Sequence, residues 1–233
     1  MPTAKPLEAF PAHDNRRRTK HIGANDLDDA AVRQSLLNEI AAGFYFWIHI
    51  ALPCTGWATM NARNGGSRSN DNPEGDELLE RERLANHQAT YVVEICLALA
   101  EVGAFFSIEN PVPSHVWICA CFRKLMCELD GAMYIVNFDQ CAYSLVLPGA
   151  AKHHYCRKSS RVWTNMVELC RLERRCPGRS AMHFHDEAFG HVVVQGVRHS
   201  RAAAASRYPL ELCREFAEGG ERALQRSLRT SSV

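Results

Sequence analysis

No apolar run in this chain is long enough to cross a bilayer. The longest candidate, Phe44 to Cys54, falls far short of the about 20 residues that a membrane-spanning helix needs, and it lacks the flanks of a signal peptide. We therefore expect no membrane partner and an intracellular protein. A basic cluster at 16–20 adds the nucleus as an alternative location, although a solvated tail is its simpler interpretation.

The chain also has almost no net charge. Its 27 lysines and arginines balance 26 acidic residues, which leaves a formal charge of +1. A protein that attracts nucleic acid through its global field carries a larger positive excess. If this chain binds nucleic acid, the contacts must come from local clusters of arginine and lysine.

Hydrophobic periodicity is missing at both ends of the chain. Residues 1–28 are polar and rich in charge, which is typical of a disordered leader, and residues 217–233 resemble a disordered tail. Between them, the segment 29–216 carries the apolar residues of a 46% hydrophobic chain. This is enough for one domain with a single core.

The middle of the chain repeats the order strand, polar segment, helix, strand. The run Phe44 to Leu52 predicts a strand buried on both faces, and the Gly-, Asn- and Ser-rich segment Thr55 to Gly75 predicts a long mobile loop. A helical pattern from Asp76 to Val102 leads to a second strand at 104–108. This order predicts an α/β fold with two parallel neighbouring strands.

Further elements follow from the same patterns. Helices are expected from Asp29 to Ile40 and from Ser114 to Leu129. A third strand at 133–138 and a fourth at 161–165 are expected to form an antiparallel pair at the far edge of the sheet. Beyond this point the signal is weaker, with a short strand at 192–194 and helical segments at 201–207 and 210–216.

Two strand ends carry residues suited to chemistry. Cys54 follows Pro53 at the end of the first strand, and Glu109 precedes Asn110 at the end of the second. Since ligands bind at the carboxyl ends of parallel strands, the thiol and the carboxyl group are expected at one edge of the sheet. Each of these residues taken alone is equally compatible with a structural role.

These residues, with the order of elements, resemble the catalytic half of the cytosine-5 DNA methyltransferases. The closest resemblance is to the divergent type found in mobile elements and large viruses. Its usual motifs PCTxW, IENP, FDQC, RxWTN and YPxxLC appear here at 53–57, 108–111, 138–141, 161–165 and 208–213. Pro111 replaces the valine of the wider family's Glu-Asn-Val signature, and the Gln-x-Arg-x-Arg signature is matched only loosely at 157–161.

The resemblance implies a set of roles on a DNA substrate. Cys54 would be the nucleophile that adds to the cytosine ring, and Glu109 would hydrogen-bond to the ring nitrogen and amino group. Arg161 would contact the carbonyl oxygen of a cytosine flipped out of the duplex. The other substrate-binding candidates are Pro53, Asn110, Arg157, Arg63 and Arg68, the last two on the polar loop that would close over the base.

The glycine-rich half of such an enzyme is lacking. Only 1–43 precedes the Pro-Cys strand, and this segment contains no F-x-G-x-G turn for S-adenosylmethionine. The resemblance covers Phe44 to Cys213, which implies a Rossmann-like methyltransferase sheet truncated at its N-terminal side, with an antiparallel edge. Either the chain is a fragment or degenerate copy of such an enzyme, or a second polypeptide supplies the half that binds S-adenosylmethionine. Activity of the chain alone is expected to be impaired.

Two other functions fit the same residues. One is a catalytically silent nucleic-acid-binding module that keeps the base pocket and the basic loop. The other is a cysteine hydrolase in which Cys54 is activated by one of the eleven histidines. The hydrolase requires a histidine within hydrogen-bonding distance of the Cys54 sulfur.

The chain lacks the ligand spacings typical of zinc fingers. Most of its ten cysteines lie in apolar patterns and are expected to be reduced and structural. Cys170, Cys176, His183 and His185 lie close together in the sequence, but neither a C-x-x-C pair nor an H-x₃₋₅-H pair is present among them. The sequence therefore predicts no metal site, with zinc at these four residues as the alternative.

Overall fold

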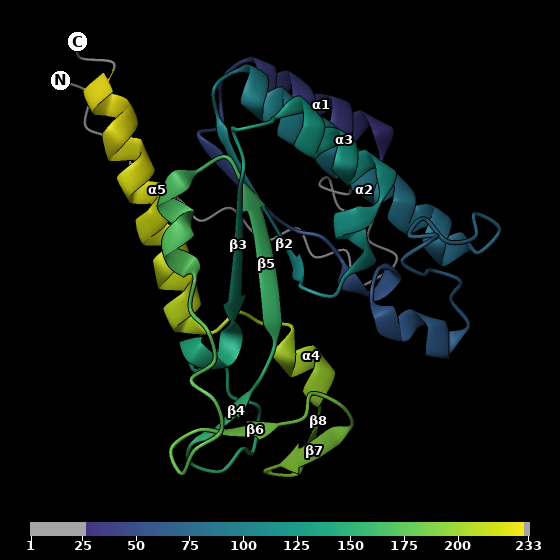
Figure 1. Ribbon diagram of the computed structural model, residues 1–233, viewed down its shortest axis with the longest axis vertical. Helices are drawn as coiled ribbons and strands as arrows, with labels where there is room; N and C mark the ends of the chain where they lie inside the picture. The colour runs from purple at the N-terminus through teal and green to yellow at the C-terminus, as the bar shows by residue number, and fades with distance from the viewer. Residues whose placement is uncertain (1–26, 231–233) are drawn as a thin grey trace.

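The computed structural model describes residues 27–230. The expected leader, except for Leu27 and Asp28, lies outside this range, and so does the basic cluster at 16–20. The described chain is a mixed α/β fold, in which a four-stranded sheet has helices on both faces and a smaller lobe at one end (Figure 1). Within 27–230, no helix combines the length and the apolar character that crossing a membrane requires.

The central sheet has the strand order β1-β2-β5-β3. β1 (Trp47–Ala51) and β2 (Phe105–Pro111) are parallel, as the helix between them predicts. β5 (Ser159–Thr164) runs antiparallel to both β2 and β3 (Tyr134–Asp139). The predicted antiparallel pair at the far edge of the sheet is therefore confirmed.

β1 is shorter and more exposed than its sequence predicts. The strand begins at Trp47, its residues are half-buried or exposed, and Phe44 is 76% exposed. Its apolar side chains do pack on both faces, with Ile48 on one side and Trp47 on the other. However, none of its five residues is buried and β1 is an edge of the sheet in the described chain, so the prediction of a strand buried on both faces is wrong.

Three helices cover one face of the sheet. α1 (Ala30–Ala41) is capped by Asp29, whose side chain accepts a hydrogen bond from the Ala31 amide, and it is followed by Gly43 with φ of +75°. α2 (Glu80–Glu101) and α3 (Ala120–Glu128) match the predicted helices, although the short 3₁₀ helix η3 (His115–Ile118) replaces the first turns expected before α3. Their apolar faces enclose a core around Phe106, Ile108 and Trp163.

The opposite face is covered by α5 (Leu210–Thr230) and the 3₁₀ helix η5 (Val167–Leu172). The sequence predicts a disordered tail from 217, and this is wrong, because residues 217–230 continue the helix. Leu212, Phe216, Gly219 and Ala223 are buried at helical spacing. Gly219 allows a close approach, since a Cβ there would lie 2.6 Å from the Leu169 side chain.

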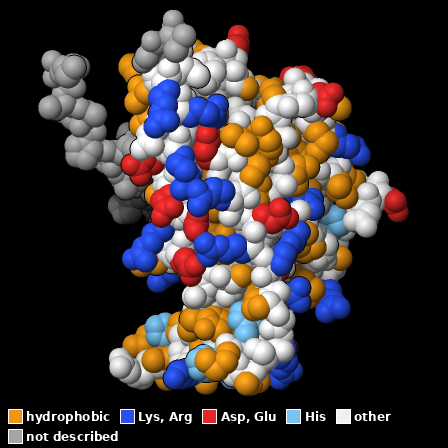
Figure 2. Space-filling view, turned by 60° about the vertical axis from the view of Figure 1, so that its left-hand side comes forward, with side chains coloured by type: hydrophobic (Ala, Val, Ile, Leu, Met, Phe, Trp, Pro, Cys, Tyr) orange, Lys and Arg blue, Asp and Glu red, His pale blue; other side chains and the backbone are white. Residues whose placement is uncertain are grey.

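The outer face of α5 is charged. It forms a column of mixed basic and acidic side chains along the molecule (Figure 2). Within this column Arg222 pairs with Glu218, and Arg226 pairs with Glu168 at 2.7 Å. Because opposite charges alternate here, this helix is no basic patch for nucleic acid.

The smaller lobe consists of short elements. β4 (His154–Cys156) pairs in parallel with β6 (Phe184–Asp186), and β7 (His191–Val194) pairs antiparallel with β8 (Val197–Ser200), which leads into α4 (Arg201–Ala205). Its apolar core is small, with only Leu145, Leu147, Cys156 and Ala205 fully buried. A core of this size gives little hydrophobic stabilisation to the lobe.

The polar segment after Cys54 folds against α2. It contains the 3₁₀ helices η1 (Cys54–Gly56) and η2 (Thr59–Asn64). Gly56 touches α2 so closely that a Cβ there would lie 2.6 Å from the Ala85 Cβ, a rigid neighbour. The backbone that carries Cys54 is therefore seated on the helix.

Gly56→Val should lower the free energy of unfolding by about 1–3 kcal/mol, because overpacking at a rigid contact costs this much. Chemical denaturation measures the change. Thr55→Val, at the exposed neighbouring position, is the control and should change stability by less than about 0.5 kcal/mol. Equal stability of both variants would show that η1 is not packed on α2 in solution.

Candidate functional site

The end of β1 is fixed by a side chain of β2. Asn110 is fully buried, and its Nδ2 donates a hydrogen bond of 2.7 Å to the carbonyl oxygen of Leu52. Pro53 follows, and Cys54 starts η1 with its carbonyl oxygen accepting from the Trp57 amide at 3.0 Å. The Cys54 thiol is half-buried and forms no disulfide. Asn110, the residue after Glu109, thus positions the segment that carries the Cys54 thiol.

Glu109 lies beside this segment. The sheet register places it opposite Ala51, three residues before Cys54, so the predicted common edge is confirmed. Glu109 is 4% exposed, and its Oε2 accepts a hydrogen bond of 2.9 Å from the Tyr208 hydroxyl. Its Oε1 lies 3.9 Å from the Lys158 ammonium and has no hydrogen-bond partner within the described chain. A buried carboxylate oxygen with spare hydrogen-bonding capacity is suited to a ligand.

Lys158 and Tyr208 are the partners of Glu109 that sequence reasoning missed. Tyr208 lies at the start of the YPxxLC motif, and Lys158 lies between the two predicted arginines, so both were near recognised motifs. The Lys158 Nζ is 5.8 Å from the centre of the Tyr208 ring. Tyr208 also lines an open hollow of about 620 Å³ between the segments 143–148 and 204–214.

His49 completes the polar group on this face. Its Nδ1 is 2.8 Å from the Ser107 Oγ, and its Nε2 is 3.3 Å from the Tyr208 hydroxyl. Burial lowers the pKa of His49 to about 4, although the negative charge of Glu109 acts to raise it. The imidazole is therefore neutral at pH 7. No histidine of the described chain hydrogen-bonds to the Cys54 thiol, which removes the support for a cysteine hydrolase.

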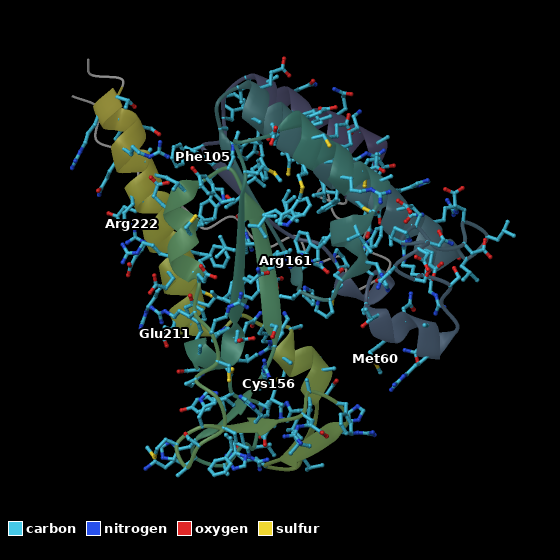
Figure 3. The ribbon with its side chains drawn as sticks, in the orientation of Figure 1. Met60, Phe105, Cys156, Arg161, Glu211 and Arg222 are labelled. Carbon is cyan, nitrogen blue, oxygen red and sulfur yellow. The ribbon has the colours of Figure 1, made fainter. Side chains whose placement is uncertain are left out.

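Arg161 lies on the other face of the sheet. Its register partners are Asn110 and Asn137, and its Nε donates a hydrogen bond of 2.8 Å to the Asn137 Oδ1. Figure 3 labels Arg161 at the central sheet. Neighbouring residues of a strand point to opposite faces, so Arg161 is brought to Asn110 and not to Glu109. Burial and the nearby Arg175 lower the pKa of Arg161.

The other predicted arginines are not gathered at the site. Arg157 is 59% exposed, with its Nε 3.9 Å from the Asp139 carboxylate, and Arg63 is exposed at the end of η2. Both remain accessible to a large ligand. Within residues 27–230, no hydrogen bond or ion pair joins either arginine to Cys54 or Glu109.

Arg68 has a structural role, which corrects its predicted contact with substrate. It is only 3% exposed. Its guanidinium donates to the carbonyl oxygens of Pro73 and Glu82, the latter at 3.0 Å, and to the Asn86 Oδ1 at 3.0 Å. It also stacks 3.7 Å from the centre of the Trp57 ring. The segment expected to be a mobile loop is therefore anchored by one of its own arginines.

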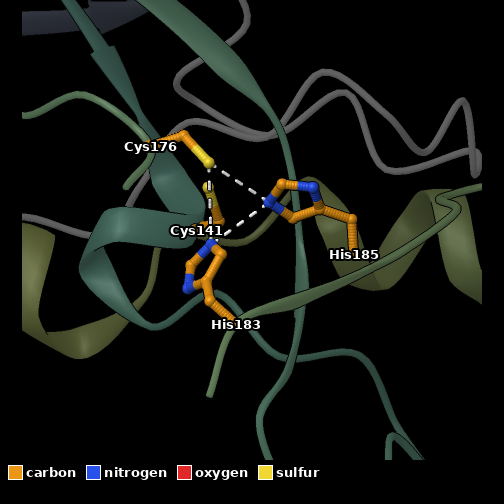
Figure 4. A group of neighbouring side chains, drawn as sticks. All are labelled: Cys141, Cys176, His183 and His185. Carbon is orange, nitrogen blue, oxygen red and sulfur yellow. Dashed lines mark hydrogen bonds between the residues drawn. The ribbon is translucent and has the colours of Figure 1, made fainter. Parts of the chain in front are cut away.

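A second group of reactive side chains lies at the far end of β3. The ligand atoms of Cys141, Cys176, His183 and His185 are all within 4.8 Å of one another (Figure 4). The sequence alternative for zinc included Cys170, but this residue packs with the α5-side core, and Cys141 of the FDQC motif takes its place. Sequence spacing missed Cys141 because it is distant along the chain and lies in an apolar pattern.

Known proteins give no independent indication of function. No protein-family model, curated protein or solved structure matches this chain significantly. The assignment of a function therefore depends on the site residues and their chemistry.

Proposed function

We propose that this chain binds a flipped cytosine of DNA and adds the Cys54 thiol to its ring, as in the cytosine-5 DNA methyltransferases. The observation that carries this proposal is the Glu109 Oε1, which is buried without a hydrogen-bond partner in the described chain, beside the strand end that leads to Cys54. The parallel β1 and β2 with an antiparallel β5 also fit the second half of a Rossmann-like methyltransferase sheet.

The chemistry needs both groups. Cytosine is a poor nucleophile at C5, so the thiolate first forms a bond from sulfur to C6, and the π electrons of the C5–C6 bond move toward C5. A carboxyl group at the ring nitrogen and amino group stabilises this electron-rich ring. The thiol proton goes to solvent, and C5 then takes a proton from water. Elimination of the thiolate reverses both steps.

The described residues do not fit a site for S-adenosylmethionine. Within residues 27–230, α1 is the first element and β1 the first strand, so no glycine-rich strand-to-helix turn precedes β1, and β1 is a sheet edge there. We therefore assign this chain only the base-binding and thiol-addition steps. A methyl donor would have to be held by residues outside the described ones, and a second polypeptide is one source of such a site. The ten unpaired cysteines and a DNA substrate suit an intracellular protein.

Covalent trapping tests this proposal without a methyl donor. DNA containing 5-azacytosine has nitrogen at ring position 5, so addition of the thiol across the C6–N5 bond gives a stable adduct with no methyl transfer. The wild-type chain should form a complex that survives denaturing electrophoresis, and Cys54→Ser should form none. Cys127→Ser, which changes an exposed cysteine on α3, should react like the wild type.

The silent nucleic-acid-binding module remains the second candidate. It is favoured by the exposed Arg63 and Arg157 and by the lack of a glycine-rich strand-to-helix turn before β1 within residues 27–230. It predicts that wild type and Cys54→Ser bind DNA equally and that neither forms the adduct. An adduct formed equally by wild type and Cys54→Ser would contradict the assignment of Cys54 as the nucleophile.

A further inference from the structure

The Cys141, Cys176, His183 and His185 cluster joins separate parts of the chain. Cys141 lies on the 3₁₀ helix η4 (Gln140–Tyr143), directly after β3 of the central sheet. Cys176 follows η5, His183 lies just before the lobe strand β6, and His185 is the middle residue of that strand. Segments of the main domain and of the lobe therefore meet at four side chains that are all metal ligands.

The distances match a tetrahedral metal. Zinc binds sulfur at about 2.3 Å and nitrogen at about 2.0–2.1 Å, so tetrahedral geometry separates a sulfur and a nitrogen ligand by about 3.5 Å and two nitrogens by about 3.3 Å. The Cys176 Sγ lies 3.3 Å from the His185 Nε2 and 3.7 Å from the His183 Nε2, and the two Nε2 atoms are 3.1 Å apart. The Cys141 Sγ lies within 4.8 Å of each of these three atoms, so it can serve as the fourth ligand of the same ion.

The surroundings hold the ligands in place. The Gly178 amide donates to the Cys176 Sγ at 3.4 Å, and the Cys176 amide donates to the Asp139 Oδ2 at 2.9 Å. The His183 ring stacks on Tyr155 with ring centres 4.7 Å apart. Cys141 is 2% and His183 is 8% exposed, so the site is largely closed to solvent. Fixed orientation of this kind is typical of built metal sites.

We propose that these four residues bind one Zn²⁺ ion in a structural Cys₂His₂ site. Four protein ligands leave no open position, which is the arrangement of structural and not catalytic zinc. Binding releases the two thiol protons. The ion fastens the lobe to the end of β3, and it supplies stability that the small apolar core of the lobe does not.

Metal analysis of the purified full chain tests the site. The wild type should contain one zinc per chain, and reconstitution with Co²⁺ should give the visible bands of tetrahedral cobalt with thiolate charge transfer. Cys176→Ser and His185→Gln should each lose both signals. Cys170→Ser is the matched control, because Cys170 is near in sequence but outside the cluster, and it should retain them.

Stability provides a second measurement. A strong chelator should lower the melting temperature of the wild type and of Cys170→Ser, but not that of His185→Gln. Circular dichroism shows whether each variant folds. His185→Gln keeps three of the four ligands, so its cobalt titration tests the site even if Cys176→Ser does not fold. Absence of stoichiometric metal, or a disulfide between Cys141 and Cys176 detected by mass in the unreduced chain, would overturn the proposal.

Discussion

Arg68→Met should lower the free energy of unfolding by about 3–5 kcal/mol, the usual cost of removing one partner from a buried charged group. The methionine keeps most of the apolar contact with Trp57 but removes every donor of the guanidinium. It leaves the Asn86 Oδ1 and the Pro73 carbonyl oxygen without that donor. The fully buried Glu82 also loses its nearby positive charge.

The same substitution should make the protein more sensitive to acid. Burial alone would raise the pKa of Glu82, but hydrogen bonds from Ser67 and from the Asp76 amide, together with the charge of Arg68, outweigh it and lower this pKa. A lowered carboxyl pKa contributes stability above the pKa of the unfolded chain, and this contribution is lost as pH falls through the folded value. Without Arg68 the folded pKa rises, so the loss begins at higher pH.

Urea denaturation at several acidic and neutral pH values measures both effects. Arg63→Met is the matched control, since Arg63 is exposed in the same segment and its loss should change stability by less than about 0.5 kcal/mol. If Arg68 instead contacted DNA, Arg68→Met would weaken DNA binding while leaving stability unchanged. That result would contradict the anchoring role.

Arg63 and Arg68, the two arginines of the polar segment, show which features cannot be predicted from the sequence. The parallel β1–β2 pair, the antiparallel pair at the far edge and the common edge of Cys54 and Glu109 follow from local patterns and chain connectivity, and all were predicted. Composition gives Arg63 and Arg68 the same surroundings, a polar Gly-rich segment. Only tertiary packing separates them, because Arg68 meets Trp57 and the first turn of α2 while Arg63 does not.

The two side-chain clusters give a similar lesson. Glu109 was predicted from its motif, but its partners Lys158 and Tyr208 come from distant segments that converge only in the folded chain. The metal-binding group was misassigned for the same reason, because local spacing favours Cys170 over the distant Cys141. In addition, α5 was missed beyond 216 because Gly219 and Gly220 weaken the helical pattern, although Gly219 permits close packing on Leu169.

Glu109→Gln should slow formation of the 5-azacytosine adduct by about 10²–10⁴-fold, the usual contribution of a positioned acid or base. Glutamine retains the size of the side chain and can accept the Tyr208 hydrogen bond, but it cannot share a proton with the ring nitrogen. Lys158 is 20% exposed and can turn toward water, so stability should change little. Quench-flow sampling followed by denaturing electrophoresis measures the rate, and melting temperature checks the fold.

Tyr208→Phe is the matched control, because it removes the hydrogen bond to Oε2 and keeps the carboxyl group. It should slow the adduct less than Glu109→Gln, while both variants bind unmodified DNA as the wild type does. A lowered melting temperature of Glu109→Gln with an unchanged adduct rate would identify Glu109 as a purely structural carboxylate. The nucleophilic role of Cys54 would stand in that case, since the serine variant tests it separately, and the activation of the base would then have to come from another group.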